Sequence, residues 1–306
     1  MATLEATQDA PVGRERLLAL GAALLTVTLW ASAFVGIRSA GRDLSPGALA
    51  LGRLLVASIA LGALALARRE GLPSRRDLGG IALCGVLWFA LYSVALNEAE
   101  RTVDAGTAAM LVNIGPLLIA VLAGILLREG FPRALVAGCA IAFAGAVVIG
   151  IATSNGRLVP SWGAILCLVA ALAYAGGVVT QKPLLARVSP LQITWLAATS
   201  GAVVCLPFAP SLWSDASSAR ASAIGWTVYL GIVPTAIGFI AWAYALSRTT
   251  AGRMGSTTYL VTPIAILLGW LLLDETPPAL ALLGGALCLA GVAVARRVQR
   301  PSPKAS

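Results

Sequence analysis

Arg53 is the charged residue whose position most strongly suggests a chemical role. It lies seven residues after Pro46, inside an apolar run long enough to cross a membrane. A charged side chain at the centre of such a helix costs about 2.5–3.5 kcal/mol, so it usually faces the interior of a helix bundle. Two interpretations remain open: Arg53 binds a carboxylate or phosphate of a substrate, or it is a structural residue hydrogen-bonded to carbonyl groups at a helix end.

Aromatic side chains recur at helical spacing in similar apolar runs. Trp30 and Phe34 are four residues apart, as are Trp88 and Tyr92, so each pair shares one helix face. Aromatic walls with a few polar groups suit a cavity for apolar or amphipathic solutes. For each residue alone, packing in the core or against lipid remains the alternative interpretation. Further candidates for the same wall are Tyr174, Trp242 and Tyr259.

Polar residues gather near two prolines that lie within apolar runs. Asn113 lies three residues before Pro116, and the corresponding part of a later run contains Pro263. Proline leaves a carbonyl unpaired one turn earlier, and polar groups at membrane depth need partners. We therefore expect two kinked helices beside a polar cavity wall. Hydrogen bonding between helices alone is the alternative interpretation of these side chains. The polar candidates are Thr107, Asn113, Ser256, Thr257 and Thr262.

Several kinds of chemistry are excluded by what the chain lacks. It contains no histidine, which removes histidine metal ligands and general bases. Its five cysteines form no CxxC pair, and no carboxylate lies well inside an apolar run, which weakens the case for cationic drugs and for proton antiport. No glycine loop for phosphate is present, so ATP-driven transport is excluded. We expect no metal, no cofactor and no enzymatic activity.

The composition predicts the elements that must position these residues. Hydrophobic residues make up 58% of the 306 residues and charged residues only 11%, and long apolar runs recur along the whole chain. We therefore expect an all-α membrane protein with ten transmembrane helices. The expected helices cover residues 17–37, 46–67, 78–96, 104–127, 131–151, 162–181, 190–210, 222–246, 254–273 and 279–295.

The segment from Arg101 to Glu129 returns in altered form between Arg248 and Glu275. Similar matches follow the whole chain about 145 residues apart, which indicates a five-helix unit written twice. We expect a first repeat at 17–151, a linker at 152–161 and a second repeat at 162–296. Short tails at 1–16 and 297–306 complete the chain.

The basic residues predict how these helices cross the membrane. Because five is an odd number, the second repeat must enter from the side opposite to the first. If the N-terminus is cytoplasmic, 16 of the 22 lysines and arginines fall on the cytoplasmic side and five on the other. This bias places both termini in the cytoplasm and accounts for the net charge of +9 without a nucleic-acid partner. Inverted repeats of this kind are typical of secondary transporters, whose substrate binds between the repeats.

Four segments resemble the EamA family of the drug/metabolite transporter superfamily. They are LWASAFVGIR from Leu29, NIGPLLIAVLAGILLRE from Asn113, ALAYAGGVVTQKPL from Ala171 and LVTPIAILLGWLLLDE from Leu260. The resemblance covers about residues 17–296 and implies two inverted halves around a central cavity, with the helices at 131–151 and 279–295 at the periphery. It also favours a structural role for Arg53, since members with different substrates carry an arginine there.

The resemblance implies a transporter of the inner membrane that exports small metabolites, with amino acids as the leading candidates, by alternating access. The alternatives are efflux of hydrophobic drugs, uptake of another small organic solute, and a membrane scaffold without transport. The expected partners are the lipid bilayer and a small-molecule substrate, and the expected assembly is a monomer or a weak dimer.

Overall fold

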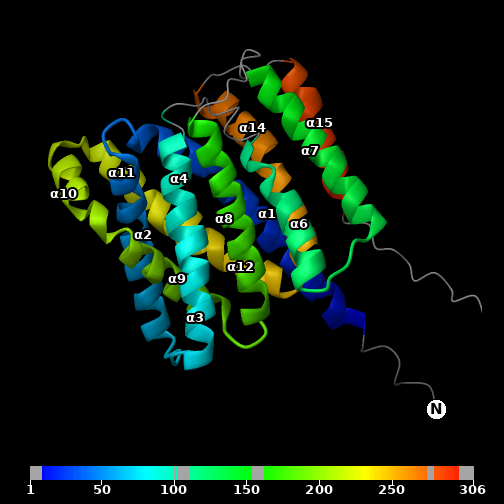
Figure 1. The fold of residues 1–306 in the computed structure, drawn as a ribbon, viewed down its shortest axis with the longest axis horizontal. Coiled ribbons are helices and arrows are strands. Elements are labelled where there is room, and N and C mark those ends of the chain that lie inside the picture. The colour runs from blue at the N-terminus through cyan, green and yellow to red at the C-terminus, as the bar shows by residue number, and fades with distance from the viewer. Residues whose placement is uncertain (1–8, 100, 102–110, 154–161, 274–278, 296–306) are drawn as a thin grey trace, which may run out of the picture.

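The computed structural model describes residues 9–99, 101, 111–153, 162–273 and 279–295, and these residues form helices and connections without a strand (Figure 1). In the first half of the chain the elements are α1 (Asp9–Ala40), α2 (Pro46–Ala67), α3 (Arg75–Cys84), η1 (Gly85–Leu91), α4 (Tyr92–Ala99), α6 (Gly115–Leu126) and α7 (Arg133–Thr153). In the second half they are α8 (Trp162–Leu184), α9 (Pro190–Val204), η2 (Leu206–Phe208), α10 (Ala209–Ser218), α11 (Ala221–Leu230), η3 (Gly231–Ile237), α12 (Gly238–Ser247), α13 (Ala251–Thr257), η4 (Thr258–Leu260), α14 (Val261–Leu273) and α15 (Ala279–Ala295).

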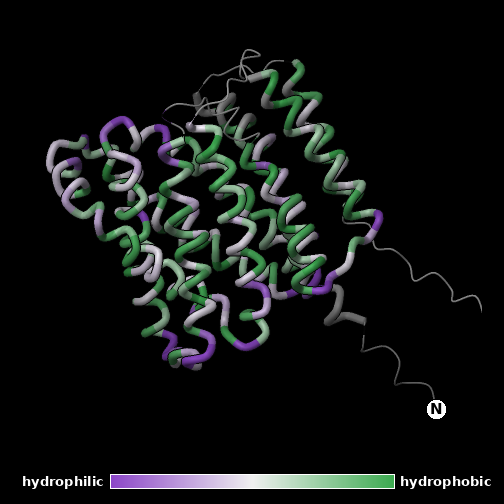
Figure 2. The backbone as a smooth tube through the Cα atoms, viewed as in Figure 1, coloured by the Kyte–Doolittle hydropathy of each residue, from purple (hydrophilic) through white to green (hydrophobic). Residues whose placement is uncertain are grey.

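The helices are apolar enough for a membrane, which confirms the expected all-α membrane class. Within the described residues five helices are long and apolar enough to span it, or six if the bent pair α9 and α10 is one span. The helices at the other expected spans are shorter in the described part of the chain, so the structure does not establish the count of ten. Figure 2 shows hydrophobic residues along the bundle and hydrophilic residues at the connections.

Several helices differ from their expected bounds for local reasons. Helix α1 begins at Asp9 rather than at residue 17, within the expected tail. The expected helix at 190–210 instead ends as α9 at Val204, and the chain bends by 55° before α10. Pro207 lies in this bend, where it cannot donate a backbone hydrogen bond to continue the helix. Residues 104–110 of the expected fourth helix, including Thr107, lie outside the described residues.

The helix contacts reflect the duplication of the sequence. Helix α1 of the first half packs on α11 and α12 of the second half. In the same way, α8 of the second half packs on α3 and α4 of the first half. Likewise α1 packs on α14 and α8 on α6, while α2 pairs with its equivalent α9 and α7 with α15. Helix α2 begins at the upper end of the bundle in Figure 1 and α9 at the lower end, as an inverted repeat requires.

Two π-helical segments mark equivalent positions in the halves. Segments η1 and η3 are seven residues long each, and η3 begins 146 residues after η1. Each interrupts a long helix with a wider turn. Such turns re-aim neighbouring side chains and are frequent at functional sites.

The two ends of the bundle are joined by equivalent polar contacts. We name the ends after residues: the Asp43 face, with the α1–α2 connection and α10, and the Glu129 face, with the α6–α7 and α8–α9 connections (Figure 1). On the Asp43 face, Arg220 donates to Asp43 at 2.9 Å, and the Ser45 N–H donates to Asp215 at 2.8 Å.

The matching contacts lie on the Glu129 face. There Arg187 donates to Asp77 at 2.8 Å, and the Ser189 hydroxyl donates to Glu70 at 2.5 Å. All four contacts surround the ends of the paired helices α2 and α9. This pair of helices is therefore held at both faces.

The Asp43–Arg220 contact depends on pH. Hydrogen bonds from Arg220 hold the pKa of the Asp43 carboxyl below its ordinary value. Because this pKa is lower in the folded protein than in the unfolded chain, the ionised carboxylate stabilises the folded protein at pH values above the ordinary pKa. This stabilisation is lost as the pH falls through the lowered pKa. The contact therefore persists at neutral pH.

Helices α7 and α15 form a pair at the edge of the bundle (Figure 1). Small residues let their backbones approach closely: a Cβ atom added at Gly145 would lie 2.6 Å from the Gly284 carbonyl oxygen. This agrees with the peripheral position that the family resemblance implies for these helices.

We predict that Gly145→Ala lowers the free energy of unfolding by about 1–3 kcal/mol, because the added methyl group must push α15 away from α7. Gly225→Ala is the matched control, since a Cβ atom there meets no other atom within 4 Å. Thermal unfolding of the detergent-purified variants measures the difference. Equal melting temperatures for the two variants would show that the helices do not pack as described.

Candidate functional site

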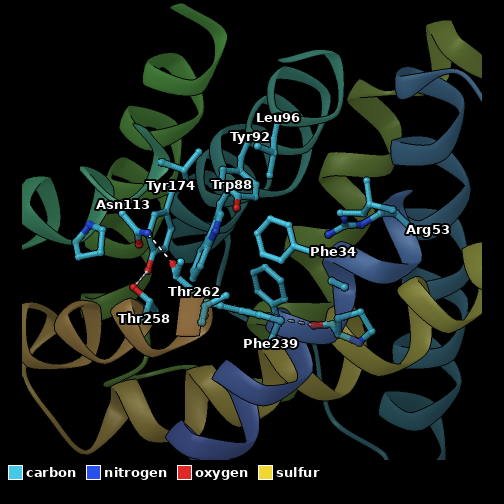
Figure 3. Close-up of a pocket in the computed structure, with 17 residues that line it drawn as sticks. Phe34, Arg53, Trp88, Tyr92, Leu96, Asn113, Tyr174, Phe239, Thr258 and Thr262 are labelled. Atoms are coloured by element: carbon cyan, nitrogen blue, oxygen red, sulfur yellow. Dashed lines mark hydrogen bonds between the residues drawn. The ribbon is translucent and has the colours of Figure 1, made fainter. Parts of the chain in front are cut away.

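A cavity of about 110 Å³ lies between helices of both halves (Figure 3). Its lining includes residues of α1, α2, η1, α4, α6, α8, η3, α12, η4 and α14. Most of the residues singled out from the sequence line it, namely Trp30, Phe34, Arg53, Trp88, Tyr92, Asn113, Pro116, Tyr174 and Thr262. The fold thus brings together side chains that are far apart in the sequence.

Aromatic rings form the centre of the site. Trp30 and Trp88 meet edge to face with their ring centroids 5.8 Å apart, and Trp88 lies 4.8 Å from Phe239. Edge-to-face and tilted pairs at these distances are favourable beyond the burial of their area. Trp88 comes from η1, so the π-helical turn helps to aim this ring at the cavity.

The π-helical segment of the second half supplies a polar contact to the same cluster. The Trp30 indole N–H donates to the carbonyl oxygen of Pro234, within η3, at 3.2 Å. An indole N–H that is buried needs an acceptor, and the widened turn provides one. This bond fixes the Trp30 ring between the two halves.

Polar side chains lie at one side of the aromatic cluster (Figure 3). The Asn113 amide N–H donates to the Thr262 hydroxyl at 2.8 Å, which joins the first half to the second. The Tyr174 hydroxyl donates to the Thr258 hydroxyl at 3.2 Å. The cavity therefore offers neutral oxygen atoms at this side.

The polar side coincides with breaks in two equivalent helices. In the first half, the helical residues Leu111 and Val112 are followed by a turn at Asn113 and Ile114, just before α6 and Pro116. In the second half the 3₁₀ turn η4 precedes Pro263 in the same way. Irregular backbone thus lies within one turn before both prolines, as expected where a proline cannot bond to the preceding turn.

Arg53 lies at the other side of the aromatic cluster (Figure 3). It is 8% exposed and belongs to α2, in the half of the helix nearer the Asp43 face. Arg53 is the one charged residue among the described residues that line the cavity. The site therefore combines a cationic side, an aromatic centre and a neutral polar side.

The cavity extends toward the Asp43 face and is closed toward the Glu129 face. Its lining includes Ile37, close to the end of α1, and Leu96, in the last turn of α4. Toward the other face, Trp242, Leu246 and Met254 are 0% exposed. Trp242 stacks on Trp30 at 5.0 Å and so lies beneath the cavity.

Four of the sequence-predicted residues that the structure describes lie outside the lining, namely Trp242, Ser256, Thr257 and Tyr259. Trp242 is buried below Trp30 and donates to the Gln181 side chain at 3.1 Å. Ser256 bonds to the Arg253 carbonyl oxygen of its own helix, and Tyr259 is buried in the cluster formed with α7 and α15. The expectation that they line the cavity does not hold, because α12 presents Phe239 to the cavity, and η4 and α14 present Thr258, Val261 and Thr262.

Eight lining residues were not singled out from the sequence, namely Ala33, Ile37, Leu96, Val112, Pro234, Phe239, Thr258 and Val261. The repeat contains a signal for two of them. Pro234 lies 146 residues after Trp88, and Phe239 lies 147 residues after Tyr92. Aligning the two repeats, and assigning to the cavity each residue aligned with a candidate, would have predicted that Pro234 and Phe239 line it.

We predict that Asn113 and Thr262 are energetically coupled. Thr262→Val leaves the buried Asn113 amide without its acceptor and should cost about 1–2 kcal/mol of unfolding free energy. In the double variant Asn113→Leu/Thr262→Val the loss should be smaller than the sum of the single losses by about 0.6–1.5 kcal/mol. Thermal unfolding of the four proteins measures this coupling, and strictly additive losses would rule out the hydrogen bond.

Comparison with known proteins identifies the family. Residues 17–151 and 161–297 each match the EamA-like transporter family. The chain is 40% identical over 279 residues to a probable terminal-alkyne amino-acid exporter of Streptantibioticus cattleyicolor, covering 91% of this chain and 93% of that protein. It is 26% identical to a probable amino-acid metabolite efflux pump of Escherichia coli, covering 88% and 92% of the two chains.

A solved structure supports the same fold. A crystal structure with 21% sequence identity aligns with a TM-score of 0.74 and covers 91% of this chain and 96% of its own. The family matches together span nearly the whole chain, in two copies that follow the repeat in the sequence. The chain therefore belongs to the EamA-like transporter family.

Proposed function

We propose that the protein exports small amino acids with uncharged side chains, which bind in the central cavity. The observation that carries this proposal is the arrangement of Arg53 and the aromatic cluster around one cavity that extends toward the Asp43 face. An amino acid that is bound there would contact both halves of the protein. Rearrangement of the halves would then expose it to the other face, as in alternating access.

Arg53 is the proposed partner of the substrate carboxylate. A guanidinium group binds a carboxylate through two parallel hydrogen bonds, and this pairing is stronger in a buried site than in water. Arg53 is 8% exposed and lines the cavity, so a carboxylate could approach it away from bulk water. Its interactions with the surrounding protein would hold the guanidinium in place for this contact.

The aromatic and polar sides are proposed to receive the rest of the substrate. The rings of Trp30 and Trp88 offer apolar surface to a side chain and π faces to an ammonium group. The lining residues that the structure describes include no carboxylate, so a cationic side chain would lack a counter-ion and would be repelled by Arg53. This favours amino acids with uncharged side chains over cationic drugs.

The names of the relatives support this substrate class. The relatives from Streptantibioticus cattleyicolor and Escherichia coli are named as exporters of amino acids or amino-acid metabolites. Efflux of uncharged hydrophobic drugs is the second candidate, because the aromatic centre of the cavity would also accept such compounds.

The direction of transport is proposed from the charge distribution. The bias of lysine and arginine supports a cytoplasmic position for the Glu129 face and both termini. The cavity then extends toward the outside, which is where an exporter releases its substrate. The plasma membrane is the proposed location.

We predict that apolar amino acids raise the melting temperature of the detergent-purified protein, because a ligand that binds only the folded state stabilises it by mass action. In Arg53→Gln this shift should be lost, and in Arg53→Lys affinity should fall at least tenfold, since lysine cannot form the bidentate contact. Comparison with the matching amino-acid amides tests the carboxylate directly. A shift that is equal for acids and amides would assign Arg53 a structural role, and a shift with uncharged drugs alone would favour the second candidate.

A further inference from the structure

A short motif occurs twice on the Glu129 face. The sequence Arg-Glu-Gly-x-Pro stands at 69–73, after α2, and at 128–132, after α6. In both copies the arginine has a left-handed backbone, with φ of 52° at Arg69 and 56° at Arg128. A residue in this conformation ends a helix and reverses the chain, which here directs the following glutamate back toward the bundle.

Both glutamates bind the start of a helix in the second half. Glu129 accepts hydrogen bonds from the backbone N–H groups of Ala251 at 2.7 Å and Gly252 at 3.1 Å, the first two residues of α13. Glu70 accepts from the hydroxyl of Ser189, the residue that caps α9. A carboxylate satisfies N–H groups that have no partner within the helix and interacts favourably with the helix dipole.

The two glutamates differ in what surrounds them. Glu70 lies beside α2 and α9, and on the Asp43 face the segment that leads into α2 is also bonded to Arg220 and to α10, which follows α9 in the chain. This pair of helices therefore has polar contacts at both faces. Glu129 joins α6 to α13, and the polar side of the cavity lies farther along the same two helical segments, at Asn113 and Thr262. One end of each segment therefore contacts the other segment on the Glu129 face. Farther from that face, the same two segments line the cavity.

Close packing seals α6 against α13 below the cavity. A Cβ atom added at Gly255 would lie 3.0 Å from the Ile119 side chain, and one at Gly252 would lie 3.7 Å from the Cα atom of Ala120. Ile119 is 0% exposed. A substrate could leave toward the Glu129 face along this path only if α6 and α13 separate, which would break the hydrogen bonds of Glu129.

We propose that Glu129 holds the transport path closed at the Glu129 face, and that its release from α13 accompanies opening at that face. Glu129 is a positioning residue, since it acts on the helices and does not touch the substrate. Glu70, although it belongs to the same motif, is a fixed contact of the scaffold. The inference rests on the proposed alternating access but not on the identity of the substrate.

The test measures access to the cavity from each side of the membrane. Ala33 lies in the cavity lining, so Ala33→Cys provides a reporter, and the five native cysteines are buried. A membrane-impermeant maleimide is applied to intact cells and to inside-out vesicles. With wild-type Glu129 the reporter should react from the side of the Asp43 face.

Glu129→Gln should shift the equilibrium from the state that is open toward the Asp43 face to the state that is open toward the Glu129 face. The uncharged amide keeps one acceptor but loses the negative charge. We expect labelling from the Asp43 face to slow about tenfold and labelling from the Glu129 face to appear. Glu70→Gln is the matched control and should label as wild type. A glutamate that only supports local structure would not change access to the opposite face.

A second variant removes the donor instead of the acceptor. Ala251→Pro deletes one N–H at the first helical position, where proline is tolerated, and the extended backbone of Thr250 (φ −71°, ψ 151°) suits a residue before proline. It should shift labelling in the same direction as Glu129→Gln. If both variants fold and label as wild type, or if Glu70→Gln shifts access equally, the proposal is wrong. Because the readout needs no substrate, a failure to bind amino acids would count against the proposed function alone.

Discussion

Burial of polar groups in an apolar bundle is the constraint on which this structure depends. In a membrane, a buried polar group that is not paired within the protein is costly. Asn113 pairs with Thr262, Tyr174 with Thr258, and Trp30 with a carbonyl of η3. Two of these three bonds, those of Asn113 and Trp30, join the first half to the second. The polar groups that a substrate would meet are thus also groups that hold the halves together around the cavity.

The sequence predicted the content of the site better than its geometry. Charge and aromatic type at helical spacing identified Arg53, Trp30 and Trp88, because a charge or a cluster of rings within an apolar run is unusual. The register of the expected helix at 254–273 was missed: η4 turns Thr258 and Thr262 toward the cavity and Tyr259 away from it. Short 3₁₀ and π turns depend on packing between helices, which leaves little trace in hydropathy.

The bend after α9 was missed for a different reason. Pro207 is visible in the sequence, yet prolines are common in membrane helices and do not by themselves mark an end. In contrast, the duplication was visible throughout, and the equivalent helix contacts follow it. The repeat also relates Trp88 to Pro234, so an internal alignment contains information about the site that residue types alone do not.

Transport of an amino acid through the cavity is the central claim, and solute counterflow in proteoliposomes tests it most directly. Purified protein is reconstituted into liposomes loaded with an unlabelled apolar amino acid, and a trace of the labelled compound is added outside. Our account predicts transient accumulation of label with the wild-type protein and none with Arg53→Gln. No accumulation of any amino acid with the folded wild-type protein, or equal accumulation with Arg53→Gln, would contradict it.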